Sequence, residues 1–199
     1  MTRREFVGGS AAFAAAYGSF SSFAGDGNAA LEAKKKWFRE AQYGMMVHWG
    51  LYSLLGGEWK GKVMPGIAEW AQAYFRIPTV EYSKLAKVFN PVYFNADEWV
   101  QLARDAGMKY IVFTSKHHDG FAMFHSKVSK FNIVDATPFK RDILGELASA
   151  CRAEGIQLNF YYSLMDWHRA DYPAGFLTKT IPFARERKPD YAAYKRFML

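Results

Sequence analysis

The sequence predicts an α/β fold in which helices cover a parallel β-sheet. A helix, a glycine, an apolar strand and a polar loop follow one another twice, over residues 95–119 and again over 142–168. The strands are nearly continuous apolar runs, which is typical of parallel sheets buried on both faces. Polar side chains also gather directly after each strand, and parallel α/β folds bind their ligands at those carboxyl ends.

The first strand is predicted at Tyr43–Val47, a short apolar run that we expect to be buried. A basic helical segment, Leu31–Glu40, precedes it. Directly after the strand the chain reads His48-Trp49-Gly50, so His48 is the first polar side chain at a strand end.

A long loop is predicted next, over residues 51–77. Loops of this length are usually either functional or disordered. Its large aromatic side chains, Trp59, Trp70 and Tyr74, favour an ordered and functional loop.

Three helices are predicted from residues that can cap their first turns. Thr79 is expected to cap a helix at 80–89, Asn95 a helix at 96–106, and Asp142 a helix at 143–154. Gly107 and Gly155 end the second and third helices. Cys151 lies on the apolar face of the third helix, so we interpret it as a core residue.

The second strand ends before two adjacent histidines, His117 and His118. Neighbouring side chains on a strand point to opposite faces, so the pair can serve one site only where the strand has ended. Lys116 breaks the apolar run, and Asp119-Gly120 is a turn pair. The histidine pair is therefore predicted on a loop at the carboxyl end of the strand.

The third strand is predicted at 155–163 and carries polar chemistry at the same end. Asn159, Tyr161 and Ser163 share one face by the twofold alternation of a strand. Asp166, Trp167 and His168 follow directly. With His48 and the histidine pair, these residues predict one shared site at the carboxyl ends of three strands.

Composition narrows the class of protein. The chain has 199 residues, of which 50% are hydrophobic and 23% charged, as expected for a globular domain with a core. Its formal net charge of +7 comes from scattered residues, with no basic stripe interleaved with aromatics, so we expect no nucleic-acid partner. The single cysteine excludes an internal disulfide.

Residues 1–24 are predicted to be a twin-arginine-like export signal, followed by a basic linker at 25–36. Arg3-Arg4 is followed by Phe6 and an uncharged stretch rich in Ala, Gly and Ser, which is too weakly apolar to span a membrane. Cleavage is expected after Ala24. We expect an exported bacterial protein, periplasmic or extracellular, that has no membrane association once the signal is removed.

The residues alone leave several chemistries open. His48, His117, His118 and Asp119 could ligate a metal ion, but adjacent histidines seldom bind one ion and no H-x-H or H-E-x-x-H spacing is present. No G-x-S-x-G motif marks a serine nucleophile. Sugar hydrolysis needs two carboxylates, and nothing ranks a pair among the candidates, which are Glu58, Glu69, Asp119 and Asp166.

Several blocks resemble the family 29 α-L-fucosidases, glycoside hydrolases with a (β/α)₈ barrel. They are YGMMVHWGLYS, GEWKGK, AEWAQAY, KHHDGF and FYYSLMDWH, which keep the family's order between Trp37 and Arg169. The resemblance implies a retaining exo-α-L-fucosidase that removes terminal fucose through a covalent fucosyl-enzyme. It also implies a TIM-like barrel, of which about three βα units lie within residues 37–199.

The resemblance implies roles for individual residues. The residues expected to bind fucose are His48, Glu69, Trp70, His117, His118 and Tyr161. Secondary candidates are Trp59, Asp166 and Trp167. We expect no metal and no cofactor, and a fucosylated glycan as the partner; a homo-oligomer of the full-length protein is compatible with the sequence.

The catalytic carboxylates are expected elsewhere. The family's nucleophile is an aspartate at the end of the next strand, and its acid/base follows later, so both are expected beyond Leu199. The 199-residue chain is accordingly expected to be an inactive N-terminal fragment of the catalytic domain. Two alternatives are a non-catalytic fucose-binding protein and a metal-dependent hydrolase.

Overall fold

The computed structural model describes residues 26–172 and 189–198, so the predicted export signal at 1–24 lies outside the described residues. The chain divides into two units, of which the first ends at Gln42 and the second begins at Tyr43. The first contains α2 (Asp26–Ala41), which includes the basic helical segment predicted at 31–40 and extends over residues 26–36, where a linker was predicted. None of the described helices is both long enough and apolar enough to cross a membrane.

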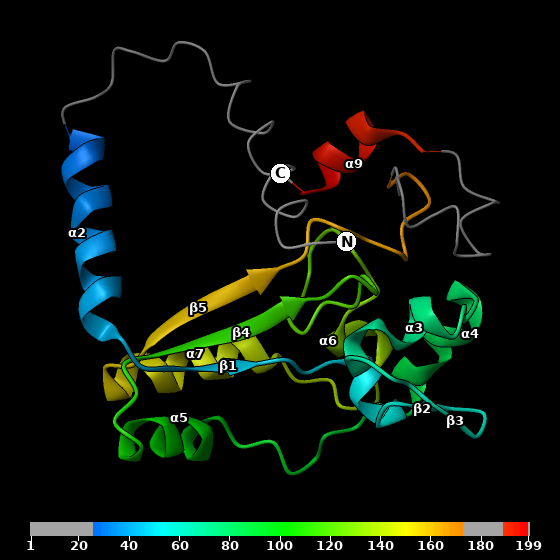
Figure 1. Cartoon of the computed structure of the whole chain (residues 1–199), viewed down its shortest axis with the longest axis horizontal. Helices are drawn as coiled ribbons and strands as arrows, with labels where there is room; N and C mark the ends of the chain where they lie inside the picture. Colours follow the sequence, from blue (N-terminus) through cyan, green and yellow to red (C-terminus); the bar gives the residue numbers. More distant parts are fainter. Residues whose placement is uncertain (1–25, 173–188, 199) are drawn as a thin grey trace. The chain divides into compact units, whose positions relative to one another are not determined.

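A three-stranded parallel sheet forms the second unit's framework (Figure 1). Its strands, in spatial order, are β1 (Gly44–Val47), β4 (Tyr110–Lys116) and β5 (Gln157–Tyr162). The register sets Met45 beside Ile111 and Ile111 beside Leu158. All three strands run the same way, so their carboxyl ends meet at one edge. The predicted α/β class with a parallel sheet is confirmed.

Helices α5 (Ala96–Asp105) and α7 (Ile143–Glu154) pack with β4 in the core, to which the connecting segments also contribute buried residues. Ile111 and Phe113 of β4 are completely buried in the same cluster as Val100 and Leu147 of the helices. Cys151 is buried there too, as predicted.

The predicted caps of these two helices are confirmed. The Asn95 side chain accepts hydrogen bonds from the backbone N–H groups of Asp97 and Glu98, and that of Asp142 accepts one from Gly145. Gly155 ends α7 in the left-handed conformation, with φ of 67°, where glycine is favoured. Local sequence therefore determines both helix starts and the stop of α7.

The expectation of strands buried on both faces is wrong in part. Met46 of β1 is 54% exposed, and Phe160 of β5 is 53% exposed. Met46 lies on the sheet face opposite Ile111 and Phe113, which are the residues that pack with α5 and α7. Phe160 shares the face of Phe113, but β5 is the last strand of the described sheet, so its outer side is open.

The segment predicted as a long loop, residues 51–77, contains short regular elements instead. They are η2 (Leu51–Leu55), a hairpin of β2 (Glu58–Trp59) and β3 (Lys62–Val63), η3 (Ala68–Trp70) and α3 (Ala71–Tyr74). Each is too short to show the hydrophobic periodicity by which longer helices and strands are recognised. The segment is therefore ordered, as its aromatic side chains predicted.

The predicted cap at Thr79 is wrong. Helix α4 (Thr79–Tyr82) already includes this residue, and Pro78 occupies the preceding position without a side-chain cap. The Thr79 hydroxyl instead donates to the Trp167 carbonyl oxygen at 3.5 Å. The helix continues as η4 (Ser83–Lys87), and the remaining short helices are α6 (Ile133–Ala136) and α9 (Tyr191–Met198).

Candidate functional site

Side chains from the ends of all three strands meet at the carboxyl edge of the sheet. His48 follows β1, His117 follows β4, and Tyr161 belongs to the end of β5. The ring centroids are 5.5 Å apart for His48 and His117, 5.8 Å for His48 and Tyr161, and 5.9 Å for His117 and Tyr161. Residues far apart in the sequence thus form one compact cluster.

The segment between β1 and α4 adds an acidic and an aromatic side chain to this cluster. Oε1 of Glu69 lies 4.0 Å from Nε2 of His48, and the Trp70 ring lies 5.2 Å from the His118 ring. The His48 and Glu69 side chains remain 32% and 19% exposed, so a ligand can reach them. We call the six residues His48, Glu69, Trp70, His117, His118 and Tyr161 the histidine rim.

A tight turn presents the histidine pair. The Gly120 N–H donates to the His117 carbonyl oxygen at 3.1 Å, and Gly120 has φ of +81°, which favours glycine. The Asp119 carboxylate points inward, where it accepts hydrogen bonds from the backbone N–H of Phe121 at 3.1 Å and the Tyr82 hydroxyl at 2.8 Å. Asp119-Gly120 therefore shapes the turn that leaves both histidines at the edge of the sheet.

Burial also affects the Asp119 carboxyl electrostatically. Asp119 is almost completely buried, and this burial raises its pKa to about 6 against the effect of its two hydrogen bonds, which lower the pKa. The Asp119 carboxyl group therefore binds a proton more readily than a carboxylate in water does.

Both histidines of the pair are held neutral near pH 7. Burial, with the charges of His118, His48 and Lys116 as smaller causes, lowers the pKa of His117 to about 3. Burial, with the neighbouring Lys116 and His48, lowers the pKa of His118 to about 4, against the opposing effect of Glu69. A neutral imidazole has one N–H donor and one nitrogen acceptor, which suits recognition of hydroxyl groups.

Ser163, which lies just after β5, contacts one histidine of the pair, His118. Its Oγ lies 2.6 Å from Nδ1 of His118 and donates to the Met165 carbonyl oxygen at 2.8 Å. The sequence places Ser163 within the predicted site, on the strand face of Tyr161, but does not indicate its contact with His118. Its position on the same strand face as Tyr161 was the one sequence feature that pointed to a place near the rim.

Two secondary candidates lie beneath the rim. Asp166 is buried in an ion pair with Lys116 at 3.2 Å, and it also accepts hydrogen bonds from the backbone N–H groups of His168 and Arg169. Trp167 is buried, and its ring packs 5.3 Å from His118 and 5.4 Å from Trp70. Both residues are placed to hold the rim rather than to meet a ligand.

The structure does not bring the third secondary candidate, Trp59, to the rim. Trp59 lies on the β2–β3 hairpin and lines a separate hollow of about 680 Å³ with Tyr74, Pro78 and Glu81. Its ring also lies 5.3 Å from the Lys60 ammonium. This position favours packing of the hairpin as its role.

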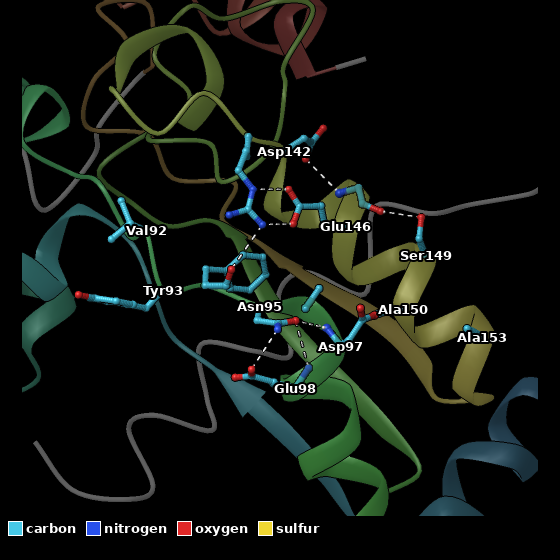
Figure 2. A pocket seen from close by; sticks show the side chains of 14 residues that line it. Val92, Tyr93, Asn95, Asp97, Glu98, Asp142, Glu146, Ser149, Ala150 and Ala153 are labelled. Carbon is cyan, nitrogen blue, oxygen red and sulfur yellow. Dashed lines mark hydrogen bonds and ion pairs between the residues drawn. The ribbon is translucent and has the colours of Figure 1, made fainter.

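A wider hollow of about 1060 Å³ lies between α5 and α7 (Figure 2). Its lining includes the cap residues Asn95 and Asp142 and the ion pair of Arg141 with Glu146. Figure 2 shows these polar groups bonded to one another or to the backbone of the helices. It contains no residue of the histidine rim, and we interpret it as the groove between two neighbouring helices.

The rim can recognise a polyhydroxylated ligand. It combines neutral imidazoles, a phenol, a carboxylate and an indole, which can exchange hydrogen bonds with hydroxyl groups and cover an apolar sugar face. Within residues 26–172 and 189–198, no group of three or more His, Cys, Asp or Glu side chains is arranged to hold a metal ion.

Comparison with known proteins identifies the relatives of the chain. The family model described as alpha-L-fucosidase matches residues 24–199. The mouse tissue alpha-L-fucosidase is 36% identical over 176 residues, which cover 77% of this chain and 38% of the mouse protein. This chain therefore spans much less than the full length of that relative.

The chain is also similar to solved structures of alpha-L-fucosidases. The unliganded alpha-L-fucosidase AlfC from Lactobacillus casei superposes with a TM-score of 0.72 at 47% identity, covering 79% of this chain and 52% of AlfC. An AlfC variant in complex with Fuca(1,6)GlcNAc superposes with a TM-score of 0.74 at 45% identity, covering 82% and 54% of the two chains.

Proposed function

The chain belongs to the α-L-fucosidase family, and from that premise we propose that the full-length protein is a retaining exo-glycosidase releasing terminal α-L-fucose. The observation that carries the proposal is the meeting of His48, His117 and Tyr161 at the carboxyl ends of three parallel strands. In this proposal the three βα units form part of a (β/α)₈ barrel, whose ligands bind at that rim.

The rim binds and orients the sugar in this proposal. Neutral His117 and His118 exchange hydrogen bonds with fucose hydroxyls, while Glu69 and His48, 4.0 Å apart, can contact one ligand together. Hydrogen bonds that strengthen in the oxocarbenium-like transition state raise kcat as well as affinity. The Trp70 ring offers an apolar surface to the sugar.

The two catalytic carboxylates of a retaining glycosidase are proposed to come from another part of the protein. Asp119 and Asp166 are buried and occupied by structural hydrogen bonds, and Glu58 is exposed on the hairpin. Of these four carboxylates, Glu69 alone reaches the rim, and we assign it to binding. The 199-residue chain alone is therefore expected to hydrolyse no α-L-fucoside.

A fucosylated glycan is the proposed substrate class. The related AlfC variant was solved in complex with Fuca(1,6)GlcNAc, which supports a fucosylated glycan as the substrate proposed for this protein. In this proposal, specificity for the terminal fucose residue comes from the hydrogen-bonding groups of the rim.

The test is hydrolysis by the full-length protein. We expect turnover of 4-nitrophenyl α-L-fucopyranoside but not of the β-L-fucoside, with the α-anomer of fucose as the first product by NMR, as retention requires. First formation of the β-anomer would contradict retention. Fucose binding without turnover would favour the non-catalytic alternative, and loss of turnover in EDTA would favour the metal-dependent one.

We also propose that the protein is exported through its first 24 residues. The support is the Arg3-Arg4 pair, the uncharged stretch after it and the small residues before the expected cleavage point. Mass spectrometry of the mature protein should give a chain beginning at Gly25. An intact N-terminus on the purified periplasmic or secreted protein would contradict cleavage there.

A further inference from the structure

The Ser163 hydroxyl connects His118 to the backbone behind the rim. Its oxygen lies 2.8 Å from the Met165 carbonyl oxygen and 2.6 Å from Nδ1 of His118. A carbonyl oxygen can only accept, so the single hydroxyl proton of Ser163 is used in the bond to Met165. Toward His118 the serine oxygen then presents lone pairs alone, and Nδ1 of His118 must be the donor.

This direction determines which ring nitrogen carries the proton. Burial and the neighbouring Lys116 keep His118 neutral near pH 7, so the ring holds one proton. With that proton on Nδ1, Nε2 carries a lone pair on the opposite edge of the ring. The Met165 carbonyl oxygen also accepts from the Lys116 ammonium at 3.4 Å, but a reversed arrangement, with Ser163 donating to Nδ1, would set two oxygens 2.8 Å apart with no proton between them.

We propose that Ser163 is a positioning residue that holds His118 in the Nδ1-protonated tautomer and thereby reserves Nε2 as an acceptor for a substrate hydroxyl. The inference rests on the proposed function, because a sugar hydroxyl is the donor that Nε2 would meet. His117 differs: its buried Nδ1 has no hydrogen-bond partner in the described part of the chain. Of the two histidines, only His118 therefore has its tautomer determined by Ser163 and Met165.

A second serine and histidine supply a matched control outside the rim. Oγ of Ser83 donates to the Thr79 carbonyl oxygen at 2.7 Å and lies 3.4 Å from Nδ1 of His168. The His168 ring stacks on Phe131 with centroids 4.0 Å apart. Removal of the Ser83 hydroxyl therefore repeats the chemical change at a histidine that is not in the rim.

The experiment reads the tautomer directly in the full-length protein. Long-range proton–nitrogen NMR spectra of protein labelled with ¹⁵N-histidine distinguish the two neutral tautomers, and the His118→Gln variant assigns the signal. The wild type should show Nδ1 protonated and Nε2 unprotonated. Ser163→Ala should lose this pattern, and its kcat/KM on 4-nitrophenyl α-L-fucopyranoside should fall about tenfold, the value of one hydrogen bond. Ser163→Thr should restore both, and Ser83→Ala should change neither.

Either of two results would overturn the proposal. One is a wild-type His118 protonated on Nε2, which decides the matter even if Ser163→Ala does not fold. The other is a folded Ser163→Ala variant with an unchanged tautomer or with kcat/KM within about twofold of wild type. If the wild type hydrolyses no fucoside, the proposed function fails, while the NMR pattern still decides whether Ser163 sets the tautomer.

Discussion

The Nζ atom of Lys116 lies 3.2 Å from Oδ2 of Asp166, and their side chains are only 3% and 1% exposed. Lys116 is the last residue of β4, directly before the histidine pair, and Asp166 lies in the segment after β5. The ammonium also lies 4.7 Å from the Tyr162 ring centroid. This buried pair joins the two segments that carry His117, His118 and Ser163.

Loss of the Lys116 ammonium should destabilise the protein strongly. Lys116→Met leaves a buried carboxylate without its cation, which typically costs about 3–5 kcal/mol in the free energy of unfolding. The exposed pair of Lys60 and Glu81 supplies the control, since its side chains are 68% and 38% exposed and Lys60→Met should cost less than about 1 kcal/mol. Denaturant unfolding of the full-length variants measures both. Equal losses would contradict a structural role for the buried pair.

Gly120→Ala should disturb the segment beneath the rim. A Cβ at position 120 would lie 2.5 Å from Oδ1 of Asp166 and 2.7 Å from Cβ of His168, and φ is +81°. At Gly107, φ is +77° but an added Cβ meets nothing within 4 Å, so Gly107→Ala tests the backbone strain alone. We expect about 1 kcal/mol of destabilisation for Gly107→Ala and about 1–3 kcal/mol more for Gly120→Ala.

The same two variants should differ in activity. The clash at Gly120 displaces Asp166 and its neighbour Trp167, whose ring packs on His118. Gly120→Ala should therefore lower kcat/KM on an α-L-fucoside, whereas Gly107→Ala should not. If Gly120→Ala has the same stability and activity as Gly107→Ala, the contact of the added Cβ with Asp166 and His168 does not matter, and the prediction is wrong.

The stability contribution of Asp119 should depend on pH. Burial raises its pKa from 3.8 to about 6, so between these values the folded protein holds a proton that the unfolded chain releases. The contribution is complete below about pH 4 and is lost as pH rises through about 6. Its size is about 3 kcal/mol, on the order expected for a shift of about two pKa units.

Asp119→Asn isolates this effect because its side chain does not titrate. The unfolding free energy of the variant minus that of the wild type should rise by about 3 kcal/mol between pH 4 and pH 7. Asp105→Asn on the surface of α5 controls for the loss of one negative charge. A difference that is constant across this pH range would contradict the assignment of the shift to burial of Asp119.

The part of the rim at the strand ends could be predicted from local rules, whereas Glu69 and Trp70 were expected only from the family resemblance. Polar residues that follow apolar strands must lie at one edge of a parallel sheet, which is why the sequence predicts that His48, His117 and Tyr161 lie close together. The caps at Asn95 and Asp142 likewise depend only on neighbouring residues. Contacts of this kind need no knowledge of distant partners.

The supporting residues could not be predicted because their partners are far away in the sequence. Nothing in the neighbourhood of Asp166 indicates that Lys116 will neutralise it, or that Thr79 will bond to the Trp167 carbonyl instead of capping a helix. Trp59 was also beyond prediction, since the hairpin that directs it to another hollow is only a few residues long.

The most direct measurement is the kcat/KM of rim variants of the full-length protein on 4-nitrophenyl α-L-fucopyranoside. His48→Ala, His117→Ala and Tyr161→Phe should each lower kcat/KM about tenfold or more, because each removes a hydrogen bond to the sugar. Trp59→Phe, on the separate hairpin, should stay within about twofold of wild type. Folded rim variants with wild-type kcat/KM would contradict the assignment of fucose binding to these three strand ends.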